Sequence, residues 1–543
     1  MQQGGTGSTM SAPRRTRVNA LQTGSDTLVR VESCARLGPR PEIGASMTTA
    51  IAHPRLDLAA RRALGEAARE RVPASLHAKW LPAPDRADPV DLLVEQNATR
   101  EADLVPVRHG RMSVSPFTFY RGAARLMAAD LATTPTAGLE VQLCGDAHLS
   151  NFGGFASPER QLLFGLNDFD ETLPGPFEYD LKRMAASFAI AAQNNRFSLD
   201  DVRAVSAESV KAYRTGMAEF AEMRTMDIWY AHMSEADIRE ALQSIKQTSS
   251  DERKARKHKA AKASTDEART GHASSVDKAI KNAEKTMRKG RSRDSLNALS
   301  KLAEVVDGKH RIVSRPPLVI PLREVAASFE MTQQEALSAV SDQFERYRST
   351  LTGDRRQLLE RFRIVDVARK VVGVGSVGTR AFIVLLEGRD NQDPLFLQVK
   401  EASSSVLEEH LPKSTFLSAG ERVVAGQRLM QAASDIFLGW TTGLDVSRSY
   451  YWRQLRDMKT SVLVEGMAPF GLSFYARICG WTLARAHARS GDPVALAEYL
   501  GAGSAIDDAV ADFSVQYAEQ NQQDYQSFLT AIASGRIEAV QGV

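Results

Sequence analysis

The chain has 543 residues, of which 43% are hydrophobic and 25% charged, and its formal net charge at pH 7 is +3. This length is too great for one hydrophobic core and predicts two or three folding units of ordinary globular composition. The small basic excess does not by itself indicate a nucleic-acid or membrane partner, and no apolar run of about 18 residues predicts a transmembrane helix.

The N-terminal residues 1–50 are rich in Gly, Ser, Thr and Arg and lack the apolar core of a signal peptide, so we expect a disordered tail. The three cysteines, Cys34, Cys144 and Cys479, are far apart in the sequence. This number and spacing predict neither a disulfide framework nor a zinc site. They fit a reducing compartment, and we expect a cytoplasmic protein.

Residues 51–365 are expected to form a mainly helical large lobe that also carries two short strands. The first strand, Leu139 to Leu143, runs into the loop CGDAHLSNFGG, whose composition is typical of turns. The second strand is QLLFGLNDFD, at residues 161–170, and a helix with one apolar face follows it.

A basic segment, residues 251–293, holds 14 Lys and Arg residues against 6 Asp and Glu residues. With few large apolar side chains, it favours a solvated helical excursion from the large lobe. Contact with nucleic acid or an acidic partner is the alternative, but the segment lacks the interleaved aromatic residues that stack on bases, so we expect no nucleic-acid partner. The following residues, 298–365, are expected to be mainly helical, with an interruption at SRPPLVIPL.

The composition changes at about residue 366. The stretches VARKVVGVGSVGTRAFIVLLEG and DPLFLQVKEA are β-branched, alternating and punctuated by glycine, which predicts an antiparallel hairpin. A helix at about 418–435 and a strand at SYYWRQLRD would complete a small β lobe over residues 366–460. We expect residues 461–543 to be helices that pack on the large lobe.

The candidate active site combines GDAHLSNFG with NDFDE about 20 residues later. Phosphoryl transfer needs one carboxylate to orient the acceptor hydroxyl, and an amide and a second carboxylate to hold magnesium against the phosphates. Asp146 suits the catalytic role, and Asn151 and Asp168 suit the metal. Asp170 lies on the same side of an extended stretch as Asp168, where it could bind a second metal or make a structural bond. An ordinary polar turn is the alternative for the loop.

This pattern resembles the His-Gly-Asp-x-x-x-x-Asn loop and following Asp-Phe-Asp strand of aminoglycoside phosphotransferases and related kinase-like proteins. The resemblance implies that Asp146 is the catalytic base, that Asn151 and Asp168 are metal ligands, and that Asp180 is a buried structural carboxylate. Cys144 stands where those enzymes usually have His, at a position that supports the loop. His148 is grouped with the catalytic residues, where we expect it to orient the loop by hydrogen bonding rather than to act as a metal ligand or base.

A glycine-rich stretch over Gly373, Gly375, Ser376 and Gly378 lies between two predicted strands. A following strand excludes a Rossmann dinucleotide fingerprint, which needs a helix there, and fits the phosphate-covering loop of kinases. Lys400 ends the strand LFLQVK about 20 residues later, as does the kinase lysine that pairs with the ATP phosphates. A plain hairpin turn and an edge-strand charge are the alternatives.

The order of these features is reversed relative to kinases, because the glycine loop and the lysine follow the catalytic loop. The sequence therefore predicts an α+β, kinase-like two-lobe fold that is circularly permuted, with YYWRQLRDMK supplying the last small-lobe strand and the hinge. The carboxylate partner of Lys400 stays open among Glu401, Glu408, Glu409 and Glu421. Four basic residues could reach phosphate or lie on solvated faces: Arg121, Arg453, Arg456 and Lys459.

Most of residues 75–530 also resemble a bacterial family catalogued as domain of unknown function 2252. The stretches that carry this resemblance are SPFTFYRGAA, GDAHLSNFG, LQVKEA, RVVAGQRLMQ and YYWRQLRDMK. The family implies no settled substrate, so function must be inferred from the site.

The expected function is an ATP- and Mg²⁺-dependent phosphotransferase that acts on an unidentified, small-molecule hydroxyl acceptor. A kinase-like adenylyl transferase and a non-catalytic nucleotide-binding regulator are the alternatives. The expected partners are the nucleotide and the acceptor.

Overall fold

The computed structural model describes residues 56–259, 267–326, 331–371, 373–455 and 457–542. The tail expected at residues 1–50 lies outside these ranges. The described residues form a mixture of helices and antiparallel sheets, which confirms the expected α+β class. None of the described helices is both long and apolar enough to cross a membrane.

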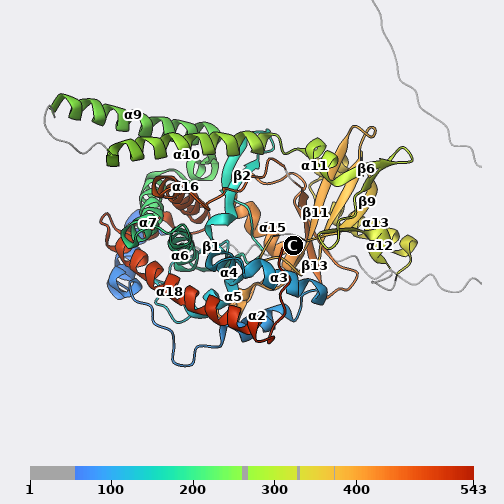
Figure 1. Ribbon diagram of the computed structural model, residues 1–543, viewed down its shortest axis with the longest axis horizontal. Coiled ribbons are helices and arrows are strands. Elements are labelled where there is room, and N and C mark those ends of the chain that lie inside the picture. The colour runs from blue at the N-terminus through green and yellow to red at the C-terminus, as the bar shows by residue number, and fades with distance from the viewer. Residues whose placement is uncertain (1–55, 260–266, 327–330, 372, 456, 543) are drawn as a thin grey trace, which may run out of the picture. The chain divides into compact units, whose positions relative to one another are not determined.

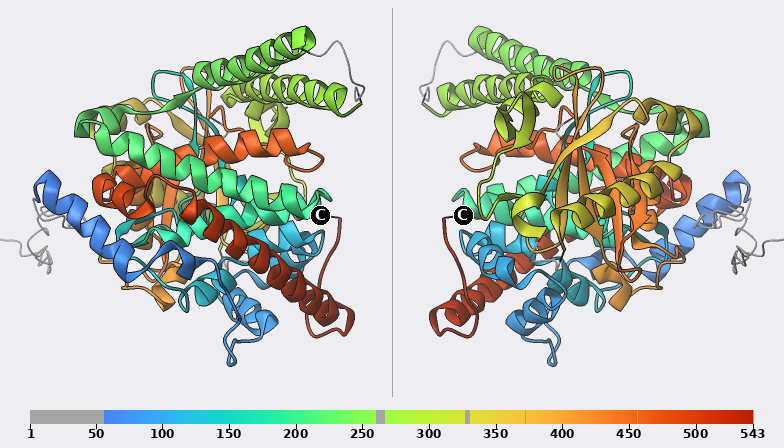
Figure 2. Two further views of the ribbon diagram at one scale, coloured as in Figure 1. Left: turned by 90° about the vertical axis from the view of Figure 1, so that its left-hand side faces the viewer. Right: turned by 90° about the vertical axis from the view of Figure 1, so that its right-hand side faces the viewer.

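Long helices gather around α7 (Leu199–Glu222), which packs on α6 (Glu178–Asn194), α16 (Pro469–Ala488) and α18 (Ala505–Ala533) (Figures 1 and 2). Helix α6 is buried on all sides along nearly its whole length, which its run of Ala, Leu, Met, Phe and Ile permits. Seven further helices belong to this part of the chain: α1 (Leu58–Arg71), α2 (Pro89–Asn97), α3 (Val105–Met112), α4 (Pro116–Gly122), α5 (Ala124–Leu131), α8 (Thr225–Tyr230) and α17 (Pro493–Leu500).

A six-stranded antiparallel sheet forms the second part, with strand order β12-β13-β11-β10-β9-β8 (Figure 1). Its alternating side chains face two different helices. Leu395 and Leu397 pack with α13 (Gln333–Ser349), and Phe396 packs with α11 (Ser295–Leu302). The strands are β8 (Val319–Pro321), β9 (Arg363–Lys370), β10 (Ala381–Glu387), β11 (Pro394–Ala402), β12 (Gly439–Thr442) and β13 (Ser449–Gln454).

The expected helical character of residues 298–365 needs correction. Two strands, β6 (Ala303–Val306) and β7 (Lys309–Ile312), form a hairpin, and β8 joins the edge of the six-stranded sheet. Helix α13 packs on that sheet, so the sheet and its covering helix begin well before residue 366. Strand β8 has three residues and ends at a proline. An edge strand tolerates proline, but in a sequence a proline normally indicates the end of a strand or helix. The remaining helices of the part that contains the six-stranded sheet are α12 (Leu322–Val325), α14 (Gly353–Leu359) and α15 (Ala419–Met430).

Two small sheets hold the candidate site. Strand β1 (Glu140–Leu143) pairs with β4 (Leu173–Pro176), and β2 (Phe152–Ala156) pairs with β3 (Leu162–Leu166), which also pairs with β5 (Met233–Ser234). The two strands expected before and after the catalytic loop are therefore confirmed, although β3 ends before the aspartates of NDFD. Strands β2 and β4 were not predicted, because FGGFA and LPGP contain the glycines and prolines that normally interrupt strands.

The basic segment 251–293 is helical where the structure describes it. Helix α9 (Glu235–Lys259) runs beside α10 (Glu267–Arg291), and the connection between them lies outside the described residues (Figure 1). The C-terminal end of α10 packs against the segment that follows β13, since a Cβ on Gly290 would lie 2.5 Å from the methyl carbon of Thr460.

Candidate active site

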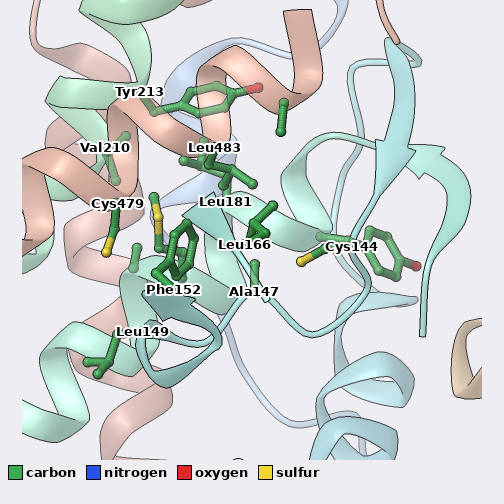
Figure 3. Close-up of a cluster of buried hydrophobic side chains, with 14 of the residues drawn as sticks. Cys144, Ala147, Leu149, Phe152, Leu166, Leu181, Val210, Tyr213, Cys479 and Leu483 are labelled. Atoms are coloured by element: carbon green, nitrogen blue, oxygen red, sulfur yellow. The ribbon is translucent and has the colours of Figure 1, made fainter. Parts of the chain in front are cut away.

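The loop between β1 and β2 is fixed by its apolar side chains. These side chains join the main hydrophobic cluster with residues of α6, α7 and α16, as Figure 3 shows. The loop contributes Cys144, Ala147, Leu149 and Phe152, and the helices contribute Leu181, Val210, Tyr213, Cys479 and Leu483. The polar residues of the same loop, Asp146, His148 and Asn151, line a cavity.

The start of the loop is held by Asp180, in the structural position that the kinase-like resemblance implies. Its carboxylate accepts hydrogen bonds from the backbone amides of Cys144 (2.7 Å) and Gly145 (3.0 Å) and lies 3.2 Å from Nε2 of His487. Gly145 has a φ of +83°, and a Cβ there would lie 2.1 Å from the carbonyl oxygen of Glu171. Only glycine fits this turn.

Asp146 is oriented by Arg183. Oδ1 of Asp146 accepts a hydrogen bond of 2.9 Å from Nε of Arg183, whose guanidinium lies 3.8 Å from the ring centroid of Tyr120 and donates to the Tyr120 carbonyl. The second oxygen, Oδ2, lies 3.6 Å from Nε2 of His148. That oxygen lines the cavity and is placed to accept a proton or hydrogen bond from a bound hydroxyl.

His148 positions the loop and does not suit a basic role. Its Nδ1 accepts a hydrogen bond of 3.2 Å from the backbone amide of Ser150, so we assign the ring proton to Nε2, which faces Asp146. Burial lowers the pKa of His148 to about 3 and keeps the ring neutral. These contacts favour the loop-orienting role that we expect for His148 within the catalytic group.

Asn151 and Asp168 fit a hard divalent cation. Nδ2 of Asn151 donates to the carbonyl oxygen of Asp146 over 2.6 Å, which leaves its Oδ1 available, and Oδ1 of Asp168 is buried without a hydrogen-bond donor. Within the described ranges no three or more His, Cys, Asp or Glu side chains form a metal cluster by themselves. A cation held by Asn151 and Asp168 would complete its coordination with phosphate and water oxygens, as Mg²⁺ commonly does.

The carboxylate partner of Lys400 is Asp170. Nζ of Lys400 is hydrogen-bonded to Oδ2 of Asp170 and lies 3.6 Å from Oδ1 of Asp168. Asp170 also accepts hydrogen bonds from the Tyr451 hydroxyl (2.7 Å) and from the Ser376 hydroxyl (3.4 Å). Both oxygens of Asp170 are engaged, which favours the structural role over a second metal.

The four glutamates that were candidates for this role form no ion pair with Lys400 among the described residues. Glu401 pairs with Arg380 and Arg448, and Glu409 pairs with Arg125. Glu408 accepts hydrogen bonds from two backbone amides of its own segment, and Glu421 lies in the first turn of α15.

The charges of neighbouring groups shift the pKa values of Lys400 and Asp168. Burial alone would lower the pKa of Lys400, but Asp168 and Asp170 raise it above its usual value, so the lysine is charged. Burial alone would raise the pKa of Asp168, but Lys400, Arg453 and Lys459 lower it below its usual value.

Two cavities meet at this site. The larger, of about 630 Å³, is lined by Asp146, His148 and Asn151. The smaller, of about 420 Å³, is lined by Lys400. Both are lined by three residues, Asp168, Gly373 and Ser376, so the glycine loop covers the junction.

The glycine loop connects β9 to β10, as expected, and is held by its carbonyl groups. Nη1 of Arg111 donates to the Gly373 carbonyl (2.5 Å), Nη1 of Arg100 to the Val377 carbonyl (2.6 Å), and the Glu101 amide to the Gly378 carbonyl (2.8 Å). The backbone amides of Gly375, Ser376 and Gly378 have no hydrogen-bond acceptor within the described part of the chain. Free amides in a glycine turn form a concave site for an anion.

The family model described as "Uncharacterized protein conserved in bacteria (DUF2252)" matches residues 100–282 and 238–531. The chain belongs to the DUF2252 family. No curated protein and no solved structure matches the chain.

Two of the four basic residues that the sequence of this DUF2252 protein left ambiguous line the smaller cavity. Arg453 and Lys459 both donate to the carbonyl oxygen of Asn167, over 3.1 and 3.3 Å, and both line the smaller cavity. Burial, with repulsion from Arg453, lowers the pKa of Lys459 to about 7. The basic stretch that begins in β13 and continues past its end was the signal in the sequence. Arg456, in the same stretch, lies outside the described residues.

Proposed function

We propose that this DUF2252 protein is an ATP- and Mg²⁺-dependent phosphotransferase with a kinase-like two-lobe fold, in which the small lobe follows the large lobe as in a circular permutation. The observation that carries the proposal is the 3.6 Å approach of Lys400 to Asp168, beneath a glycine loop and at the junction of two cavities. A hydrophobic cluster between the sheet and α13 is distinct from the cluster around α6, α7 and α16, although the latter also takes in Ala402 and Tyr451 of the sheet.

Each residue then has one role. Asp146 orients the acceptor hydroxyl and accepts its proton as the acceptor oxygen bonds to the γ-phosphorus and ADP leaves. Lys400 neutralises phosphate charge, and the free amides of the glycine loop bind phosphate oxygens. Asn151 and Asp168 would hold Mg²⁺, which when bound supplies charge neutralisation at the phosphates.

Adenylyl transfer is a second candidate, and the cations of the smaller cavity favour it. Arg453 and Lys459 lie where a kinase would bind adenine against the hinge, and charged walls suit phosphates better than a base. With the triphosphate in this cavity, the acceptor oxygen would attack the α-phosphorus and pyrophosphate would leave.

Label transfer from ATP tests both candidates. The protein would be incubated with a bacterial metabolite extract, Mg²⁺ and ATP labelled at the γ- or the α-phosphate, with an Asp146→Asn variant as control. Phosphoryl transfer predicts labelled product from γ-labelled ATP only, and adenylyl transfer predicts it from α-labelled ATP only. No label above the control, with MgATP bound, would contradict both and leave a nucleotide-binding regulator.

A further inference from the structure

The larger cavity contains many acidic residues, but each of them already has a partner. Asp146 is bonded to Arg183, Asp168 and Asp170 lie against Lys400, and Glu171 accepts a hydrogen bond from the backbone amide of Val406. The four other acidic residues bond to arginines or backbone amides: Glu95, Glu401, Glu408 and Glu409. Each of these carboxylates is therefore already held by a protein group, although Arg125 and Lys400 each face two of them.

Arg121 is the exception among the charged groups. It lies in the last turn of α4 and lines the larger cavity with Asp146 and His148, and its Nε is buried without a hydrogen-bond acceptor. No described residue forms a hydrogen bond or ion pair with its guanidinium. Burial lowers the pKa of Arg121, and the nearby carboxylates of Glu465 and Asp146 offset this effect only in part.

The other cations of this cavity are committed or solvated. Arg125 forms ion pairs with Glu95 and Glu409, and Arg100 donates to the glycine loop. Lys413 is exposed at the rim. Glu465 and Asp146 interact with Arg121 electrostatically, but neither forms a hydrogen bond with its guanidinium, so the arginine keeps donors that an anion bound in the cavity could use.

We propose that Arg121 binds an anionic group of the acceptor, a carboxylate or a phosphate, so that the substrate is an acidic hydroxyl compound. This inference rests on the proposed phosphotransferase function, since it assigns the larger cavity to the acceptor. Arg121 and Asp146 line one cavity and interact electrostatically, so the acidic group and the reacting hydroxyl belong to the same small molecule. Arginine suits the task because its planar guanidinium binds carboxylate or phosphate in bidentate fashion.

The backbone of Arg121 also links this site to the nucleotide. A Cβ on Gly375 would lie 3.3 Å from the Arg121 carbonyl oxygen, so the tip of the glycine loop packs on the end of α4. The acceptor's anion and the transferred group would therefore lie on either side of the same loop.

A matched series of three-carbon compounds tests the inference. Glycerol, glycerate, glycerol 3-phosphate and 3-amino-1,2-propanediol, together with inorganic phosphate, would be titrated calorimetrically at constant ionic strength. The protein would be free or saturated with Mg²⁺ and a non-hydrolysable ATP analogue, which occupies the γ-phosphate position. We expect the anions to bind and the neutral and cationic compounds not to. Arg121→Gln should weaken anion binding about tenfold or more, the loss of one charge-assisted pair.

Two variants control this experiment. Lys413→Gln removes the same charge from the rim of the same cavity and should leave anion binding within about twofold of the wild type, because an exposed lysine contributes little. Arg121→Lys keeps the charge and should retain part of the binding, and melting curves establish that each variant is folded.

Three results would overturn the inference: no preference for anions in the wild type, unchanged anion binding in Arg121→Gln, or equal losses in Arg121→Gln and Lys413→Gln. Weaker binding of the ATP analogue but not of ADP in Arg121→Gln would assign Arg121 to the γ-phosphate and overturn it as well. Failure of the nucleotide itself to bind, with Arg121-dependent anion binding intact, would contradict the proposed function and not the anion site.

Discussion

Asp170 and Lys400 form a hydrogen-bonded ion pair although they are 230 residues apart in the sequence. Asp170 follows β3 beside the catalytic loop, and Lys400 lies on β11 of the six-stranded sheet. The pair therefore joins the two parts of the fold at the point where their cavities meet. Tyr451, directly opposite Lys400 in the β11–β13 register, donates to the same carboxylate and fixes its position.

A double-mutant cycle on this pair measures how strongly the two parts are coupled. Lys400→Met leaves Asp170 without its cation and should destabilise the protein by about 3 kcal/mol, with a similar loss for Asp170→Asn. The double variant should lose less than the sum of the two, by about 1–3 kcal/mol. Urea unfolding measures the free energies, and Lys413→Met serves as the exposed control. Strict additivity would show that the pair contributes no coupling.

Asp146→Asn should stop turnover while nucleotide binding persists. The amide oxygen of Asn can still accept the hydrogen bond of Arg183, so the loop keeps its geometry, but the side chain no longer accepts the proton of the acceptor. We expect transfer of label to fall by about 10²-fold or more and the Kd for MgATP to change less than about twofold. Full activity in this variant would exclude Asp146 as the catalytic base.

Lys459 should take up a proton when ATP binds. Its pKa of about 7 leaves it mostly neutral at pH 8. A triphosphate in the smaller cavity, as the adenylyl-transfer candidate requires, favours the charged form, so the bound pKa then lies above the free one. ATP affinity is then greatest below pH 7 and declines as pH rises above 7 towards the bound pKa. Calorimetry in buffers of different ionisation enthalpy at pH 8 should report uptake approaching about one proton. Lys459→Met should abolish this uptake; persistence of the uptake would assign it to another group.

The sequence located the local elements of the site because their signals are short-range. Asp146 and Asn151 share one loop, and the glycines between β9 and β10 lie between two strands with clear β-branched alternation. Hydrophobic periodicity likewise identified the helix that became α6. Such features depend on neighbours within a few residues, which a single sequence displays.

The long-range partners could not be read in this way. Asp170 as the partner of Lys400, Arg183 as the partner of Asp146, and the unpaired state of Arg121 all depend on which distant segments meet. The sequence offered four glutamates close to Lys400 along the chain as its partner, but the partner in the structure is Asp170, which was not among them. The edge strand β8 escaped detection for a different reason, since its proline reads as a break and its hydrogen bonds come from β9.

The measurement that tests the central claim most directly is the thermal shift produced by ATP with and without Mg²⁺, on the wild type and on Asp168→Asn. At a hundredfold excess of ligand over Kd, binding stabilises the native state by about 2.7 kcal/mol. We predict a large Mg²⁺-dependent shift in the wild type. In Asp168→Asn that dependence should vanish, while ATP alone still stabilises the protein through Lys400 and Arg453. An equal Mg²⁺-dependent shift in both proteins, or none in the wild type, would contradict a kinase-like nucleotide site at Asp168.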